Sequence, residues 1–188
     1  LPSALAGAAV VAWTVVLGTA LWDLPSGVAA GILLATMPGW FGHMRVCRPD
    51  ALLVLFLSAG LGLAYSWWRS GEQRDATAAL TLIGLATFTK GPVGVVLFGL
   101  AFGGFLLWQR STARVWTFLS WRGVIAFLVL GLGWYAIALG GWGEVFVREH
   151  LVGRYVRNLT GGLAQGHQYS RRPLLYHLLF YPTHLLAV

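Results

Sequence analysis

Charged side chains are scarce in this sequence. Asp, Glu, Lys and Arg make up only 10% of the 188 residues, against about 25% in an average soluble domain. Hydrophobic residues reach 57%, above the roughly 45–50% of soluble domains. A soluble chain of this length has too little interior for so much apolar surface. The composition therefore excludes an ordinary soluble domain and favours a lipid bilayer as the solvent.

Cysteine is nearly absent as well. The single Cys47 excludes an internal disulfide and a cysteine-based metal site. The net charge of +7 does not indicate a nucleic-acid partner, because the basic residues lie in short clusters between apolar runs. That arrangement is typical of proteins that meet lipid phosphates at a membrane surface. We therefore expect membrane lipids as partners and no nucleic acid.

Long apolar runs fill most of the chain. Each is near the roughly 17–25 residues that a helix needs to cross a bilayer, except the fourth, which is short. The backbone must form its own hydrogen bonds inside lipid, so each run predicts a helix. We expect an all-α polytopic transmembrane bundle of about six spans, with a truncated seventh beginning near Pro173. The runs without Asp, Glu, Lys or Arg are 1–22, 24–44, 51–68, 76–89, 91–109 and 123–143.

The runs also predict how the chain is organised. Residues 1–139 are expected to form the transmembrane bundle, 140–172 a basic extracytoplasmic loop, and 173–188 the start of a further transmembrane helix. The chain starts inside an apolar run, without an initiator methionine or a charged leader segment. We therefore expect it to be an internal fragment of a longer membrane protein.

Alternating spans would place the charged segments on two sides. Asp50, Lys90 and the long loop fall on one side, whereas Arg69–Asp75 and Arg110–Arg122 fall on the other. This requires a break near Lys90, because one helix over 76–109 would be about 51 Å long, against a bilayer core of about 30 Å. Counting basic residues does not decide the orientation, since most of those on the Lys90 side lie in the loop, where they can serve binding.

Lys90 is the only charged residue between Asp75 and Arg110. It lies at a helix end, where the ammonium could simply reach the lipid headgroups. A second interpretation is a phosphate-binding lysine. Gly91 permits a turn, and Pro92 suits the first turn of the next helix. The N–H groups at that helix start would then point the same way as the ammonium, which is a favourable anion site.

Asp50 opens the third run in "HMRVCRPDALLVLF". One interpretation is structural, because a carboxylate near a helix N-cap is stabilised by the helix dipole. The other is catalytic, with Asp50 as a general base or as a group that orients an incoming hydroxyl. Arg45 and Arg48 lie nearby and would keep Asp50 ionised, or would themselves bind phosphate.

The long loop is rich in arginine. Arg148, His150, Arg154 and Arg157 are spaced about three residues apart, partly on one helical face. They indicate either a basic helix lying on the headgroups or a clamp on a phosphate, which guanidinium groups match well. His150 and His167 could bind a metal, but they lack a regular ligand spacing. No metal is therefore expected.

Three segments together are similar to a known family. "MRVCRPDALLVLF", "GLATFTKGPVGVVL" and "GWYAIAL…VFVREHLVGRY…HQYSRRPLLYHLLFYP" resemble the PMT-type branch of the GT-C glycosyltransferases. That branch includes protein O-mannosyltransferases and bacterial enzymes that add aminoarabinose to lipid A. The resemblance implies an inverting membrane glycosyltransferase of the bacterial inner membrane. It would move a sugar from a polyprenyl-phosphate-linked donor to a lipid or protein acceptor at the extracytoplasmic face, without a nucleotide or redox cofactor.

The resemblance also implies roles for single residues. Lys90 and Arg154 match residues that hold the donor phosphate, and Asp50 matches an acidic residue at the active cavity. A further acidic residue, the best candidate for the catalytic base, would lie in a loop before Leu1. Two other interpretations remain, a transporter or flippase of an anionic lipid or solute and a structural subunit. Residues expected to line the cavity are Arg45, Arg48, His150, His167 and Tyr176.

Overall fold

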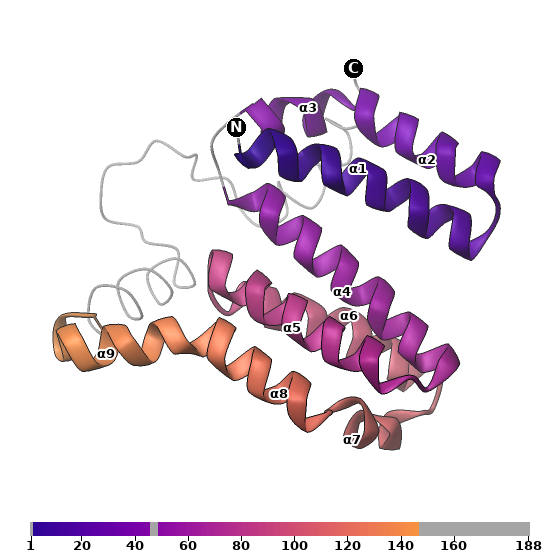
Figure 1. The fold of residues 1–188 in the computed structure, drawn as a ribbon. Helices are drawn as coiled ribbons and strands as arrows, with labels where there is room; N and C mark the ends of the chain where they lie inside the picture. The colour runs from indigo at the N-terminus through magenta and orange to yellow at the C-terminus, as the bar shows by residue number, and fades with distance from the viewer. Residues whose placement is uncertain (1, 46–48, 147–188) are drawn as a thin grey trace, which may run out of the picture. The chain divides into compact units, whose positions relative to one another are not determined.

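The structure is a computed structural model that describes residues 2–45 and 49–146. Those ranges contain helices and turns and no strand, so the predicted all-α class is confirmed (Figure 1). The α-helices are α1 (Pro2–Leu21), α2 (Leu24–Thr36), α3 (Pro38–Arg45), α4 (Asp50–Ser70), α5 (Gln73–Lys90), α6 (Val93–Trp108), α7 (Val115–Phe118), α8 (Trp121–Phe127) and α9 (Gly133–Phe146). A 3₁₀ turn, η1 (Thr112–Arg114), precedes α7, and a π-helical turn, η2 (Leu128–Leu132), joins α8 to α9.

The chain divides into two compact units, Leu1–Tyr135 and Ala136–Val188. The described part of the second unit is the remainder of α9, which ends at Phe146. Its backbone kinks at Gly143, where φ is 36° and ψ is −113°. Residues 140–146, which the sequence analysis assigned to the loop, are thus helical, and the rest of that loop lies outside the described residues.

Within residues 2–45 and 49–146, three helical stretches are long and apolar enough to cross a membrane, namely Ser3–Leu21, Asp50–Ser70 and Trp121–Gly141. The apolar helices α2 and α6 are shorter, with 13 and 16 residues. Many large apolar side chains on these helices are exposed, Leu100 among them. Such exposure is far beyond what a soluble monomer tolerates, and it fits a helical bundle that contacts lipid.

The second apolar run does not form one helix. We expected a single span over 24–44, and this expectation is wrong, because α2 ends at Thr36 and α3 begins at Pro38. Met37 between them is extended, with φ −66° and ψ 119°. A residue before proline is pushed out of the helical region by the proline ring, and proline is well suited to the first turn of the next helix.

Helix α5 lies at the centre of the first unit. It packs against α4, α6, α8 and η2. Glycines permit the close approach, because Gly60 of α4 faces Ile83 and Gly84 of α5 faces the backbone of Phe127. The buried apolar cluster around this helix consists of Ala64, Trp67, Ala76, Ala79, Leu80, Ile83, Phe98, Phe102, Leu106 and Phe118.

Several helix ends in this unit gather at one place. Ser66 Oγ near the end of α4 donates to Asp75 Oδ2 near the start of α5, at 2.6 Å. Gln73 Nε2 donates to the carbonyl of Thr117 in α7 at 3.0 Å, which brings the η1–α7 segment to the same end. We call it the Arg114 end. Its basic residues are Arg69, Arg74, Arg110, Arg114 and Arg122.

Asp50 and Lys90 lie at the other end of the same helices. Helix α4 begins with Asp50 and α5 ends with Lys90, and the two helices pack antiparallel along their length (Figure 1). We call this the Lys90 end. The predicted helix break after Lys90 and the predicted separation of Asp50 and Lys90 from the Arg69–Asp75 and Arg110–Arg122 segments are therefore confirmed.

A single methyl group at Gly27 is expected to destabilise the α1–α2 pair. Its Cβ would lie 2.5 Å from the carbonyl of Val15 and 2.6 Å from the amide of Thr19. Rigid backbone cannot yield to that overlap, so we expect Gly27→Ala to lower the free energy of unfolding by about 1–3 kcal/mol. Thermal unfolding in detergent measures the change.

Gly99→Ala is the matched control for this prediction. A Cβ at Gly99 meets nothing within 4 Å, and alanine is favoured over glycine inside a helix by about 0.5–1 kcal/mol. The control should therefore be neutral or slightly stabilising. Equal unfolding temperatures for both variants would contradict the close α1–α2 contact.

Candidate functional site

The break between α5 and α6 sets the position of Lys90. Helix α5 ends there, and Gly91 adopts φ 74° and ψ −153°, a conformation that residues with a side chain rarely adopt. The Gly91 N–H still donates to the carbonyl of Thr87 at 2.7 Å. Pro92 then leads into α6 at Val93. The lysine is therefore the last helical residue before a sharp turn, and the N-terminus of α6 follows at the same place.

Asp50 is the first residue of α4, directly after the N-cap residue Pro49. Its carboxylate Oδ1 accepts a hydrogen bond from Lys90 Nζ, and the two groups form an ion pair. The sequence predicted that both residues lie on one side, but it did not predict a direct contact. Forty positions separate them along the chain, and only the packing of α4 against α5 brings them together.

The pair is partly open to its surroundings. The side chain of Asp50 is 31% exposed and that of Lys90 46%. An ion pair this exposed contributes only roughly 0–1 kcal/mol to stability, so stability alone does not account for it. An ammonium has three N–H donors, and Asp50 occupies one of them. The other donors of Lys90 can bind an anion that enters from the open side.

Most of the other predicted site residues are not described by the structure. Arg45 is the last residue of α3, and its helix ends ahead of the segment that leads to Asp50. Their roles in binding phosphate or lining a cavity stay predictions. The ones outside the described residues are Arg48, Arg148, His150, Arg154, Arg157, His167 and Tyr176.

Charged side chains in the described ranges lie near helix ends or in turns, and the helix interiors carry none. A carrier of anionic solutes would place charges near the middle of its spans, so this distribution of charges disfavours the carrier interpretation. Residues 2–45 and 49–146 also hold no group of three His, Cys, Asp or Glu side chains suited to a metal ion.

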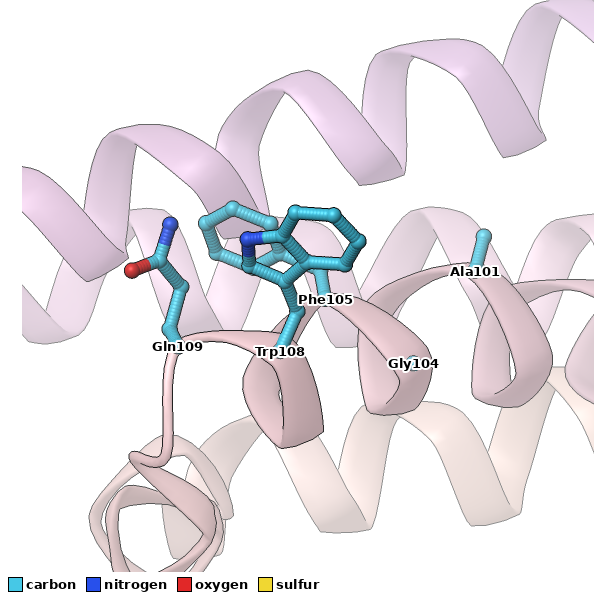
Figure 2. Close-up of a pocket in the computed structure, with 5 residues that line it drawn as sticks. All are labelled: Ala101, Gly104, Phe105, Trp108 and Gln109. Carbon is cyan, nitrogen blue, oxygen red and sulfur yellow. The ribbon is translucent and has the colours of Figure 1, made fainter.

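A shallow groove lies on α6 away from the Asp50–Lys90 pair. Ala101, Gly104, Phe105, Trp108 and Gln109 line it, as Figure 2 shows. Its lining is mostly apolar, and its volume is about 390 Å³. It occupies the last turns of α6, whereas Lys90 lies just before the first turn. The groove is therefore a feature of the Arg114 end.

The helices, their exposed apolar surface and the charged pair at a helix break define a polytopic helical membrane protein. The family model described as dolichyl-phosphate-mannose-protein mannosyltransferase matches residues 1–135. The chain belongs to this family. The match includes Asp50 and Lys90 and ends before the arginine-rich loop, so the particular branch of the family stays a prediction.

One relative comes from Aquifex aeolicus (strain VF5) and carries the name "Uncharacterized protein". It is 32% identical over 143 residues, which is 76% of this chain. The chain spans 29% of the length of that relative. No solved structure matches this chain.

Proposed function

We propose that this chain is part of an integral-membrane glycosyltransferase of the GT-C type. It would move a sugar from a polyprenyl-phosphate-linked donor to a lipid or protein acceptor at the extracytoplasmic face. The observation that carries the proposal is Lys90, a partly exposed cation at a helix break that is paired with the carboxylate of Asp50. Family membership supplies the class of reaction.

In the reaction, the bond between the anomeric carbon and the phosphate oxygen breaks, and the hydroxyl oxygen of the acceptor bonds to that carbon from the opposite face. The sugar is transferred with inversion, the polyprenyl phosphate leaves with the bonding electrons, and a carboxylate takes the hydroxyl proton. Negative charge grows on the departing phosphate. Lys90 would stabilise that charge by an interaction that is strongest in the transition state.

The Asp50–Lys90 pair carries no net charge, so a phosphate needs further cations nearby. We propose Arg154, together with Arg148 and Arg157, for this task. One guanidinium group can donate two parallel hydrogen bonds to two oxygens of a phosphate. Asp50 would accept the proton of the acceptor or hold Lys90 in place. The direct contact favours the second role in the resting chain, because an attacking hydroxyl and a leaving phosphate lie on opposite faces of the sugar carbon.

The direct test is sugar transfer by the full-length protein in liposomes, from a polyprenyl-phosphate sugar to lipid or protein acceptors. Transfer that needs the donor and forms polyprenyl phosphate supports the proposal. Movement of the intact lipid across the bilayer, without any cleavage of the sugar–phosphate bond, would instead support the carrier interpretation.

Cysteine labelling is expected to place Asp50 and Lys90 on one side of the membrane. In a Cys47→Ser background, Asp50→Cys and Lys90→Cys should react with an impermeant maleimide added to the same side. Ala113→Cys, which lies in the η1 turn at the Arg114 end, serves as the control and should react from the other side. Labelling of the first two from opposite sides would contradict the site.

A further inference from the structure

Arg110 holds an unusual backbone conformation just after α6. Its φ is 51°, and it is the one residue other than glycine with a positive φ in the described ranges. The Arg110 N–H donates to the carbonyl of Leu107 at 3.0 Å, and the Ser111 N–H donates to that of Leu106 at 2.9 Å. This pattern of helix ending normally takes glycine, since a side chain is disfavoured there. A backbone outlier of this kind points to a functional side chain.

Two more exposed arginines lie close to Arg110 in the chain. Arg114 Nη1 donates to the carbonyl of Trp68 at 3.0 Å, and its guanidinium lies 5.5 Å from the centre of the Trp67 ring. Arg122 lies 5.3 Å from the centre of its neighbouring indole. Among the described residues, these contacts use one N–H donor of Arg114 and none of Arg122, out of the five that each guanidinium has.

The carboxylates at this end are already engaged. Glu72 pairs with Arg74 at 2.7 Å, and Asp75 accepts a hydrogen bond from Ser66. Within the part of the chain that the structure describes, Arg110, Arg114 and Arg122 form no ion pair with a carboxylate. The end therefore presents a net positive surface.

The apolar groove on α6 leads directly to this surface. Figure 2 places Ala101 at one end of the groove and Gln109, the residue before Arg110, at the other. Gly104 leaves open space, because a Cβ there would meet nothing within 4 Å. The Trp108 side chain beside it is 86% exposed, and an indole is a typical interfacial side chain.

We propose that the Arg114 end binds an anionic phospholipid, with one acyl chain in the α6 groove and the phosphate at Arg110 and Arg114. Along α6 towards Arg110, the apolar groove comes first and the basic residues follow. A phospholipid has the same order, with an acyl chain followed by the phosphate. A net negative headgroup is selected because Arg110, Arg114 and Arg122 form no ion pair with a carboxylate in the described part of the chain. This site is separate from the Lys90 end and does not depend on the proposed transfer reaction.

The test uses a local fluorescent reporter. Full-length protein with Cys47→Ser and Ala113→Cys carries an environment-sensitive dye and is titrated in detergent with phosphatidylglycerol or phosphatidylcholine. We expect a saturable change with phosphatidylglycerol at an about fivefold to tenfold lower concentration, since each arginine near an anionic surface strengthens binding about fivefold. Arg110→Asn should raise that concentration about fivefold. Asparagine keeps the left-handed turn and leaves the contacts of Arg114 intact.

Two further variants complete the test. The double variant Glu72→Gln with Arg74→Gln removes a paired arginine together with its carboxylate, so the net charge is kept and the titration should stay unchanged. Gly104→Leu fills the groove and should weaken both lipids. The proposal is overturned if the phosphatidylglycerol concentration needed by Arg110→Asn stays within about twofold of that of the parent protein at an unchanged melting temperature. Equal binding of both lipids, or binding of both lipids unweakened by Gly104→Leu, also overturns it. So does tighter binding of polyprenyl phosphate than of phosphatidylglycerol at this site.

Discussion

Replacing Lys90 with alanine in the full-length protein is expected to lower sugar transfer by on the order of 10²–10³-fold, the usual effect of removing one preorganised donor from a transition state. Membrane insertion should be unaffected. A lysine that only reached the headgroups would contribute roughly 0–1 kcal/mol, and its loss would be mild. The size of the loss therefore separates the two interpretations of this residue.

Lys90→Arg sharpens this prediction. It keeps the positive charge but replaces a compact ammonium by a wide planar group. In the structure Asp50 pairs with the compact ammonium, and the wider group changes that geometry. We expect partial activity, between that of the parent protein and that of Lys90→Ala. The measurement is initial rate of transfer from a polyprenyl-phosphate sugar in liposomes, normalised to the amount of inserted protein.

Arg74→Ala provides the control for the lysine variants. It removes an exposed cation that is paired with a neighbouring carboxylate at the other end of the unit, so transfer should change little. If Lys90→Ala worked within about threefold of the parent protein, where roughly 10²-fold was expected, the phosphate-binding role of Lys90 would be lost. That result would favour the carrier and structural interpretations.

The second large effect is expected at Asp50. Asp50→Asn keeps the size of the side chain and removes its charge, and we expect transfer to fall by on the order of 10²-fold or more, as for a lost general base. A capping role predicts little change, because asparagine caps helices as well as aspartate does. In the structure Asp50 follows the N-cap residue and bonds to Lys90, so loss of its charge would also release Lys90 from its position, and the larger effect is expected in either active role.

A double variant tells the two active roles of Asp50 apart. If Asp50 positions Lys90, the double variant of Asp50→Asn with Lys90→Ala is no slower than Lys90→Ala alone. If Asp50 is a general base, the double variant is slower than either single variant. Asp75→Asn, a carboxylate bonded to Ser66 at the Arg114 end, should not alter the rate.

The helical class and the break at Lys90 could be predicted from local rules. A run without charges has no stable alternative to a helix in lipid, and Gly91 with Pro92 stops one helix and starts the next. The helix break at Met37 follows from a local rule as well, because Pro38 restricts the backbone of the residue before it. The expected single span over 24–44 rested on apolar composition alone and is therefore wrong at this point.

Only part of the candidate site could be predicted from the sequence. Counting spans placed Asp50 and Lys90 on one side, because each crossing reverses the direction of the chain. Counting could not show that their side chains meet, which depends on how closely α4 packs against α5. Gly60, facing Ile83 across that interface, allows the close approach, and a packing contact of this kind has no signal in the spacing of charges.

The sequence by itself determined the helical class, the break at Lys90 and the separation of Asp50 and Lys90 from the Arg69–Asp75 and Arg110–Arg122 segments, because these follow from local composition and from the length of each run. Only the tertiary structure decided that Asp50 neutralises Lys90 and that the groove on α6 leads to Arg110. The left-handed turn at Arg110 was likewise invisible beforehand, since an arginine gives no local preference for it. Such features arise from contacts between residues far apart in the chain or from packing that overrides local preference.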